Sequence, residues 1–344
     1  MPQPISHKVW FITGASKGFG YVWTEAALAR GDRVAAAARN IGSLDALKAK
    51  YGAWLLPLVL DVGNKAAVDA AVEQAHKQFG QIDVAINNAG YGLFGAIEEV
   101  SEQEARAQIE TNLFGALWVT QAVLPIMRAQ QSGHIIQISS IGGVWAVPTV
   151  GLYHASKWGL EGFSQALASE VKDLGIKVTI VEPGGFATEW GTTSAHRAKQ
   201  LPAYDAARAS LANVRTASMP GDPKATASAL FRIVDAAEPP LRVFFGDAGL
   251  PMIKQEYARR IATSGKNGKM SRSKRKAISP SAETSLQPKN GLRYRSKVIS
   301  SGGSFRFYDR PPQADPAGWI VQSWDIATVT GEANDFSVCT TWQD

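Results

Sequence analysis

The 344-residue sequence contains a single cysteine, Cys339. One thiol cannot form an internal disulfide, so the sequence predicts that the protein resides in a reducing compartment. Without a Cys/His cluster the thiol makes no zinc site, so no metal centre is expected. No run of 18 uncharged apolar residues occurs, and no long apolar segment precedes the first strand-like run at Val9. These absences argue against a signal peptide and a membrane span, and they predict a cytoplasmic protein that makes no membrane contact.

Acidic residues are almost missing from residues 266–300. Ten Lys and Arg residues stand there against Glu283 alone, a net charge of +9, whereas the whole chain carries +6 and the remaining residues together therefore carry −3. The basic character belongs to this segment and not to the body of the protein. Nucleic acid is therefore not an expected partner of the main domain.

Hydrophobic residues make up 45% of the chain, which is enough for a sizeable core and excludes collagen-like and wholly disordered classes. Short, nearly continuous apolar runs alternate with helix-like segments, as expected of strands that are covered on both faces. The expected strands are residues 9–12, 34–37, 55–60, 84–86, 135–138 and 178–181, and the clearest helices are 65–79 and 101–130, the latter interrupted near Pro125. This order predicts an α/β fold with a doubly wound parallel sheet.

A glycine-rich stretch, Thr13-Gly14-Ala15-Ser16-Lys17-Gly18-Phe19-Gly20, connects the first expected strand to a helix. Glycines let the backbone approach a ligand, and the free N–H groups of the helix N-terminus attract a pyrophosphate. We therefore predict that a dinucleotide binds to Gly14, Ser16, Lys17, Gly18, Phe19 and Gly20. The spacing differs from Gly-x-Gly-x-x-Gly, so an ordinary glycine-rich turn is the alternative.

Arg39 follows the second expected strand. An acidic residue near this position would bind the ribose hydroxyls of NAD, whereas a basic residue accommodates the 2′-phosphate of NADP. Arg39, supported by Lys17, favours NADP, with NAD as the less favoured coenzyme. The alternative is that Arg39 is merely solvated.

Polar residues also follow the third and fourth expected strands. Asp61, next to Val62, could meet the adenine amino group, and the alternative role of Asp61 is to cap the helix that begins near Lys65. The stretch Asn87-Asn88-Ala89-Gly90 could make a turn or fix the sheet edge beside a coenzyme. We assign Asp61, Val62, Asn88, Ala89 and Gly90 to the coenzyme site.

Tyr153 and Lys157 stand four residues apart in a helix-compatible stretch, so both side chains lie on one face. A neighbouring ammonium favours the ionised phenol, which lowers the cost of using tyrosine as an acid or base near neutrality. Ser140 can hydrogen-bond a substrate oxygen, and Asn112 can hold a water that links Lys157 to solvent. A Tyr-x3-Lys pair alone arises by chance in many helices, but here each candidate is placed correctly relative to an expected strand.

These motifs together resemble the short-chain dehydrogenase/reductase family over residues 1–265. The matching residues are Thr13-Gly14-x3-Gly18-x-Gly20, Asp61, Asn87-Asn88-Ala89-Gly90, Asn112, Ser140, Tyr153-x3-Lys157, and Pro183-Gly184 with Thr188. The resemblance implies a Rossmann-like fold and an NADP-dependent oxidoreductase that transfers a hydride between nicotinamide and a carbonyl or secondary alcohol.

The resemblance also implies a role for each matching residue. Tyr153 would be the general acid/base, and Lys157 would lower its pKa and bind the nicotinamide ribose. Ser140 would orient the substrate oxygen, and Asn112 would complete a proton relay. Pro183, Gly184 and Thr188 would hold the nicotinamide carboxamide.

Residues 186–220 lie where this family has a variable lid. An apolar pocket that suits a hydrophobic ketone or alcohol is expected from Phe94, Trp145, Val147, Phe186, Trp190, Leu201 and Tyr204. The alternative is that these side chains pack the lid against the body. Because family members often pair through the helices that carry Asn112 and Tyr153, a homo-oligomer is expected.

The end of the chain has a different composition. Residues 266–304 are polar and basic without apolar periodicity, which predicts a disordered linker. Residues 305–344 resemble the opening strands of the nuclease domain of phage terminase large subunits, where Asp325 would be a metal ligand. About 40 residues are too few for that fold, so we interpret the segment as a truncated, inactive fragment.

Two other functions stay open at this point. A regulator that senses NADP without turnover is opposed by the complete set Asn112, Ser140, Tyr153 and Lys157. A DNA-packaging nuclease is supported only by residues 305–344 and lacks the later carboxylates of a two-metal site.

Overall fold

The computed structural model describes residues 7–209, 220–246 and 249–267, except for the side chains of residues 264–267. The described residues up to Glu256 belong to one compact unit, and residues 257–267 belong to a second one. Asp325 and the whole of the predicted fragment 305–344 lie outside the described residues, as does the predicted linker from residue 268 onward. The predicted domain boundary at residue 265 falls inside helix α9 (Gly249–Asn267) and stays a prediction.

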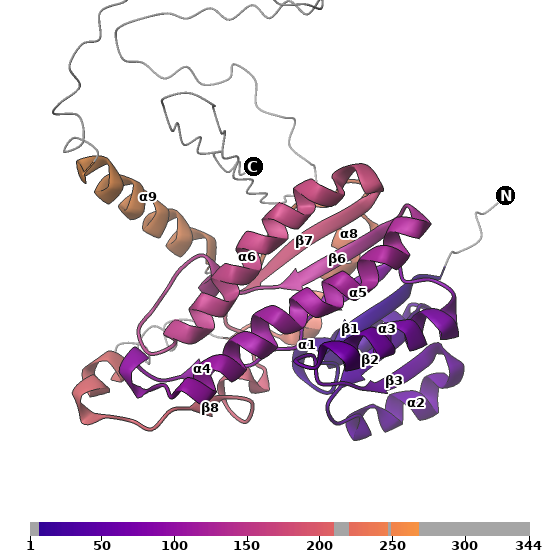
Figure 1. The fold of residues 1–344 in the computed structure, drawn as a ribbon, viewed down its shortest axis with the longest axis horizontal. Helices are drawn as coiled ribbons and strands as arrows, with labels where there is room; N and C mark the ends of the chain where they lie inside the picture. The colour runs from indigo at the N-terminus through magenta and orange to yellow at the C-terminus, as the bar shows by residue number, and fades with distance from the viewer. Residues whose placement is uncertain (1–6, 210–219, 247–248, 268–344) are drawn as a thin grey trace, which may run out of the picture. The chain divides into compact units, whose positions relative to one another are not determined.

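Seven parallel strands form a central sheet in the described part of the first unit, in the order β3-β2-β1-β4-β6-β7-β9 (Figure 1). The strands are β1 (Val9–Thr13), β2 (Arg33–Ala38), β3 (Leu55–Val59), β4 (Val84–Asn87), β6 (Gly133–Ile138), β7 (Ile176–Pro183) and β9 (Arg242–Phe245). The chain runs outward from β1 through β2 to β3 and then returns to β4 on the other side of β1. This reversal confirms the predicted doubly wound α/β fold, in which ligands bind at the carboxyl ends of the strands beside the reversal.

All six expected strands are present, and the central ones are fully buried, as their apolar sequences predict. The sequence analysis missed β9, a short strand between Pro240 and Gly246 at the edge of the sheet. It also missed a small parallel pair outside the main sheet, β5 (Leu93–Phe94) with β8 (His196–Arg197).

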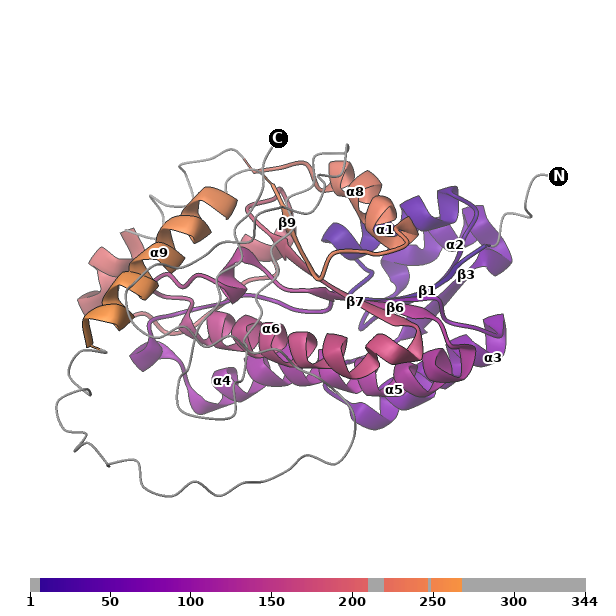
Figure 2. The same ribbon diagram turned by 90° about the horizontal axis from the view of Figure 1, so that it is seen from above.

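Helices cover both faces of the sheet (Figure 2). One face carries α3 (Lys65–Phe79), α5 (Gly115–Gln130) and α6 (Gly151–Val171), with α4 (Glu102–Ile109) preceding α5; the other carries α1 (Gly18–Ala29), α2 (Asp45–Tyr51) and α8 (Thr226–Asp235). Within the described ranges, no helix combines the length and the apolar character needed to span a membrane.

The predicted interruption of segment 101–130 near Pro125 is wrong. Helix α5 continues through Pro125, and the break lies earlier, at a π-helical turn, Glu110–Phe114. Such turns are rare and occur frequently at functional sites. This one contains Asn112, whose side chain is buried.

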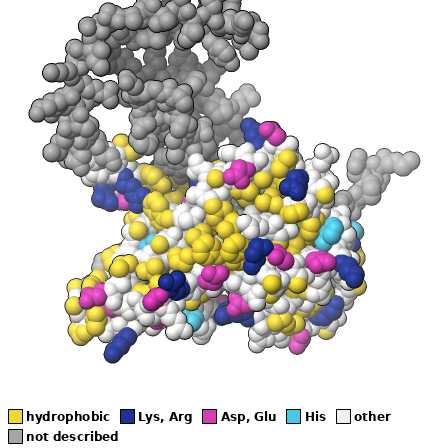
Figure 3. Space-filling view, viewed as in Figure 1, with side chains coloured by type: hydrophobic (Ala, Val, Ile, Leu, Met, Phe, Trp, Pro, Cys, Tyr) yellow, Lys and Arg dark blue, Asp and Glu magenta, His cyan; other side chains and the backbone are white. Residues whose placement is uncertain are grey.

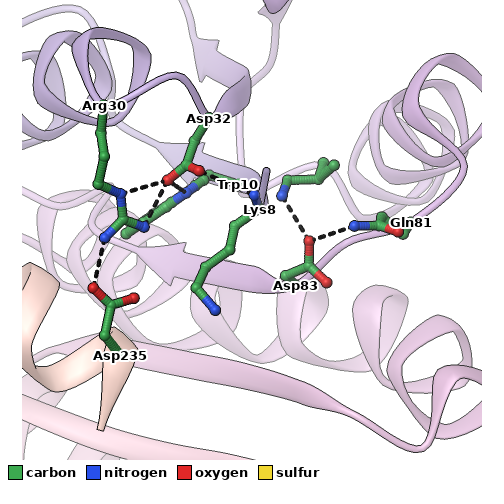
Figure 4. A network of polar contacts seen from close by, with 8 residues as sticks. Lys8, Trp10, Arg30, Asp32, Gln81, Asp83 and Asp235 are labelled. Carbon is green, nitrogen blue, oxygen red and sulfur yellow. Dashed lines mark hydrogen bonds and ion pairs between the residues drawn. The ribbon is translucent and has the colours of Figure 1, made fainter. Parts of the chain in front are cut away.

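A polar network ties together the amino ends of the central strands, away from the carboxyl ends (Figure 4). The carboxylate of Asp32 accepts hydrogen bonds from the backbone N of Lys8 (3.0 Å), Trp10 Nε1 (2.9 Å), and Arg30 Nε (2.9 Å) and Nη2 (2.6 Å). Arg30 also pairs with Asp235 of α8 at 2.8 Å, and Asp83 accepts from the backbone N of Val9 at 2.7 Å. The network therefore joins β1, the start of β2, the start of β4, and α8.

Candidate active site

The glycine loop between β1 and α1 has the geometry of a phosphate cradle. Gly14 has φ +66°, and a Cβ atom there would lie 2.9 Å from Ala89 Cα. A Cβ atom at Gly20 would collide with the carbonyl oxygen of Gly14. Helix α1 begins after Lys17 with no side-chain cap and no acidic residue in its first turn, so its N–H groups remain available to an anion. These features fit the pyrophosphate of a dinucleotide.

Asn88 joins the end of β4 to the glycine loop. Its Nδ2 donates to the carbonyl oxygens of Thr13 (2.9 Å) and Gly14 (3.1 Å). Thr13 Oγ1 accepts from the backbone N–H groups of Asn88 (3.0 Å) and Ala89 (3.1 Å). Asn88 thus fixes the sheet edge, the second of the two roles that the sequence left open. Thr13 is a positioning residue that sequence reasoning quoted but did not assign.

Arg39 directly follows β2, and both Arg39 and Lys17 are exposed. At the end of β3, the Asp61 carboxylate accepts from the backbone N of Gly63 at 3.0 Å, which closes a turn. Asn64 is the N-cap of α3 and accepts from Ala67 N at 3.1 Å. The alternative role of Asp61 as the cap of this helix is therefore wrong. Its neighbour Val62 is buried.

The four predicted catalytic residues come from three places in the chain and meet at the carboxyl ends of β4 and β6. Tyr153 and Lys157 lie in α6, Asn112 lies in the π-helical turn, and Ser140 follows β6. Lys157 Nζ lies 5.9 Å from the centroid of the Tyr153 ring, so the two groups are adjacent. Ser140 makes a side-chain hydrogen bond with Tyr153.

Lys157 and Asn112 meet beside Gly90. A Cβ atom on Gly90 would lie 3.1 Å from Asn112 Oδ1 and 3.7 Å from Lys157 Nζ. Lys157 Nζ donates to the carbonyl oxygen of Ile138 at 2.7 Å, which holds the ammonium at the end of β6. A side chain at residue 90 would therefore disturb both polar groups.

The backbone of Tyr91 and the side chain of Ser156 hold Asn112. Asn112 Oδ1 accepts from Tyr91 N at 3.0 Å, and its Nδ2 donates to Tyr91 O at 3.0 Å and to Ser156 Oγ at 3.2 Å. Ser156 in turn donates to the carbonyl oxygen of Tyr153 at 2.7 Å. Ser156 carried no distinctive motif signal, and sequence reasoning missed it.

Burial dominates the acid–base properties of the tyrosine and the lysine. It raises the pKa of Tyr153 to about 12, an effect that the hydrogen bond from Ser140 opposes. Burial also lowers the pKa of Lys157 to about 8, which the charge of Glu161 opposes. Desolvation disfavours the charged phenolate, so it is the main cause of the raised pKa of Tyr153, and the expected lowering of this pKa by Lys157 stays a prediction.

Trp190, from the segment where the sequence predicts a lid, packs against Tyr153. Its ring centroid lies 4.9 Å from that of Tyr153 and 5.4 Å from that of Phe94. Val147 and Val150 complete this apolar cluster. Three of the residues expected to line an apolar pocket, namely Phe94, Val147 and Trp190, therefore lie together beside Tyr153.

The other lid residues contact different parts of the protein. Phe186 packs edge-on against Phe19 of the glycine loop, with centroids 5.1 Å apart. The hydroxyl of Tyr204 donates to Glu98 at 2.5 Å, and the backbone N of Leu201 donates to Glu99 at 2.6 Å. Trp145 is half-buried just after the turn that contains Gly142.

Pro183, Gly184 and Thr188 lie at or just after the carboxyl end of β7. Pro183 ends β7, and Gly184 N donates to the carbonyl oxygen of Phe245 in β9 at 2.9 Å. A Cβ atom on Gly18 would lie 3.7 Å from Thr188 Cβ, so this segment borders the glycine loop. Most of the predicted coenzyme residues therefore stand on loops at the carboxyl edge of the sheet. The others are Gly18, Phe19 and Gly20 at the start of α1, Lys157 in α6 and Pro183 at the end of β7.

Comparison with known proteins gives consistent matches. A family model described as short chain dehydrogenase matches residues 8–199. Oxidoreductase BOA17 of Botryotinia fuckeliana is 40% identical over 259 residues, which cover 74% of this chain and 93% of that protein. The 3-ketodihydrosphingosine reductase of Bacteroides thetaiotaomicron is 37% identical, over 73% of this chain and 91% of that protein.

Solved structures of similar fold include enzymes with bound coenzymes. A short-chain dehydrogenase from Streptomyces avermitilis has a TM-score of 0.73 and 38% identity, over 78% of this chain and 99% of its own. A serine dehydrogenase complexed with NADP+ has a TM-score of 0.61 and 26% identity, over 69% and 94% of the two chains. A 3-ketoacyl-(acyl-carrier-protein) reductase from Brucella melitensis complexed with NADH has a TM-score of 0.59 and 25% identity, over 70% and 97%. The chain belongs to the short-chain dehydrogenase/reductase family and is an oxidoreductase.

Proposed function

We propose that the protein is an NADP-dependent reductase of a ketone or aldehyde, which also runs in reverse on a secondary alcohol, with Tyr153 as the general acid/base. The observation that carries this proposal is the convergence of Tyr153, Lys157, Ser140 and Asn112 next to an uncapped, glycine-lined helix N-terminus.

The coenzyme, when bound, supplies the hydride for the carbonyl carbon. Ser140 hydrogen-bonds the substrate oxygen, and Tyr153 delivers a proton to it. The pKa of about 12 keeps the phenol protonated at neutral pH, which is the form that a reduction requires. Lys157 and a water on Asn112 would return the proton from solvent.

Replacing Tyr153 with Phe tests this role. The variant keeps the ring contact with Trp190 but lacks the proton donor, so kcat should fall by about 10²–10⁴-fold while the NADPH Kd changes little. The measurement is NADPH oxidation with a panel of aldehydes and ketones, together with NADPH binding by fluorescence. A wild-type protein that binds NADPH but turns over none of the panel would favour the NADP-sensing regulator.

The preference for NADP over NAD rests on the exposed cations Arg39 and Lys17 beside the carboxyl end of β2. An arginine that binds the 2′-phosphate makes a charge-assisted contact, so Arg39→Ala should raise the KM for NADPH about tenfold and leave the KM for NADH almost unchanged. Arg128→Ala, which removes an exposed arginine of α5, is the matched control. Equal effects on both coenzymes would argue against phosphate recognition.

For the substrate, we propose a hydrophobic ketone or alcohol. The support is the apolar cluster of Phe94, Val147 and Trp190 around Tyr153. One relative, the 3-ketodihydrosphingosine reductase of Bacteroides thetaiotaomicron, is named for a ketone substrate.

We also propose that the protein forms a homo-oligomer through α5 and α6. Hydrophobic side chains gather over these helices (Figure 3). Phe114 and Trp158, at the start of α5 and in α6, are 38% and 37% exposed. The molar mass in solution, measured by light scattering, tests this proposal.

A further inference from the structure

His154 connects the two halves of the loop between β6 and α6. It directly follows Tyr153 in the first turn of α6, and its ring is buried. Its Nδ1 lies 2.8 Å from the carbonyl oxygen of Gly142, and the backbone N–H of Val147 donates to its Nε2 at 3.0 Å. The loop segment 140–147 is therefore held on both sides of one imidazole ring.

These two partners determine the protonation state of the ring. A carbonyl oxygen only accepts, so Nδ1 must carry the hydrogen; a backbone amide only donates, so Nε2 must be free of one. Only the neutral Nδ1–H tautomer makes both bonds. A proton on Nε2 would face the N–H of Val147 and remove that contact.

Gly142, which accepts the hydrogen bond from His154, also contacts Ser140. Gly142 N donates to Ser140 Oγ at 2.9 Å. Ser140 Oγ thereby accepts from the loop and keeps its own hydrogen for Tyr153 or a substrate oxygen. A Cβ atom at residue 142 would lie 2.8 Å from His154 Nδ1, so the close approach of the ring requires glycine there.

The hydrogen bond to Val147 connects His154 to the apolar cluster around Tyr153. Val147 packs in the cluster that contains Tyr153 and Trp190. Release of Val147 would therefore move a side chain that contacts the tyrosine ring.

Charged groups do not stabilise a protonated ring in the described part of the chain. The elements packed against α6 are the turn Ile141–Gly143 and β5, which carry no charged residue, and α4, the π-helical turn, β7 and the turn Lys172–Leu174. Lys172 and Asp173 of the last turn follow the end of α6 that is opposite to His154. The charged side chains near α6 have other partners: Glu102 with Arg106, Glu104 with Ser101, Glu110 with Trp118, Lys157 with Ile138, Glu161 and Glu182 with Arg242, and Lys177 with Ala236. Tyr153, with ring centroids 5.9 Å apart, is the titratable neighbour.

We propose that His154 is a positioning residue that holds loop 140–147 in its reactive arrangement only while neutral, so that acidification releases Ser140 and Val147 and reversibly stops turnover. The inference rests on the proposed reductase function. Burial lowers the pKa of His154 below its ordinary 6.5, an effect that the bond to the carbonyl oxygen of Gly142 opposes, so the neutral ring prevails at physiological pH.

Two substitutions separate this role from simple packing. His154→Gln offers an N–H and a carbonyl oxygen to the same partners but takes up no proton, whereas His154→Phe fills similar space and makes neither bond. At pH 7.5, the Gln variant should keep kcat within about threefold, and the Phe variant should lose about tenfold or more in kcat with little change in NADPH Kd, because misplaced catalytic groups slow the chemical step. Both are compared with His7→Gln, a substitution of an exposed histidine.

The pH profile of kcat is the decisive readout. The wild type and His7→Gln should lose activity reversibly on the acid side of pH 6.5, and the Gln variant should keep its activity to lower pH. The proposal would be overturned if kcat of the wild type and of His154→Gln fell over the same acidic pH range, or if His154→Phe kept full activity.

A second measurement does not depend on turnover. The ¹⁵N chemical shifts of the His154 ring in the full-length protein should report the Nδ1–H tautomer at pH 7.5, and the Val147 amide resonance should shift as the ring protonates. An Nε2–H tautomer would overturn the inference even in an active enzyme. The expected shifts without any turnover would instead show that the proposed function had failed.

Discussion

Trp190 lies against the reactive tyrosine, and the backbone of Gly92 leaves room for its ring. A Cβ atom at Gly92 would lie 2.7 Å from Trp190 Cζ2. The indole therefore covers one side of Tyr153. A substrate that reaches the phenol must pass or replace this ring.

Trp190→Ala should change substrate preference more than coenzyme affinity. Loss of the indole removes apolar contact area next to the substrate, so kcat/KM should change about tenfold or more between small and bulky ketones, while the NADPH Kd changes by less than about twofold. Trp54→Ala, at a tryptophan that is 41% exposed, is the control. Equal losses in substrate and coenzyme parameters would mean that Trp190 only packs the lid.

Strands β7 and β9 and helix α6 are joined by three buried charged side chains. Arg242 of β9 lies 3.0 Å from Glu161 of α6 and 3.6 Å from Glu182 of β7. One guanidinium faces two carboxylates, so burial and the charge of Glu161 raise the pKa of Glu182 well above its ordinary value. Because Arg242 is the first residue of β9, the charge cluster helps to fix this strand beside β7 and α6.

This arrangement predicts a pH-dependent effect of Glu182→Gln on stability. A carboxyl whose pKa is higher in the folded than in the unfolded protein stabilises the fold below its unfolded pKa, and that contribution is lost as the pH rises through the folded value. Gln cannot ionise, so the Tm of the variant relative to wild type should rise between pH 5 and pH 9. Calorimetry at both pH values, with the exposed Glu73→Gln as control, tests this; a pH-independent difference would contradict it.

The Asp32 network joins strands that are distant in the sequence, so its loss should destabilise the whole unit. Asp32→Ala leaves Trp10 Nε1 and the amide of Lys8 without their acceptor and leaves Arg30 with Asp235 alone, so it should lower the free energy of unfolding by about 2–4 kcal/mol. Asp69→Ala, which breaks the exposed pair with Lys65, should change it by less than about 0.5 kcal/mol. Urea denaturation measures both variants. Similar values for the two would show that the network contributes little.

At the scale of the whole molecule, every residue assigned to catalysis, to the coenzyme or to the apolar cluster around Tyr153 lies between Gly14 and Trp190, inside the first compact unit. None comes from residues 268–344. The function that we propose therefore relies on none of the residues from 268 onward.

Removal of residues 268–344, which keeps all of α9, should leave kcat and the NADPH KM of the reductase within about twofold of the full-length values, because no reacting or binding group is lost. Steady-state kinetics of the two proteins, with circular dichroism as a check on folding, makes the comparison. A truncated protein that fails to fold would place the domain boundary further along the chain.

Local sequence was sufficient for the strands and for the adjacency of Tyr153 and Lys157. Val9 to Ile12 read as a buried strand because a parallel strand covered on both faces must be apolar throughout, and the spacing of Tyr153 and Lys157 puts them on one helix face wherever the helix lies. The glycine loop was also predictable, since few other residues tolerate its backbone.

Only the tertiary structure decided how these elements act on one another. Three features could not be predicted from the local sequence: the π-helical turn at Asn112, the contact of Trp190 with Tyr153 and the two hydrogen bonds of His154. Burial likewise determines that the pKa of Tyr153 is raised and not lowered, although the sequence places an ammonium beside it. Periodicity and spacing depend on the chain's own geometry, whereas desolvation and side-chain contact depend on what the rest of the chain brings close.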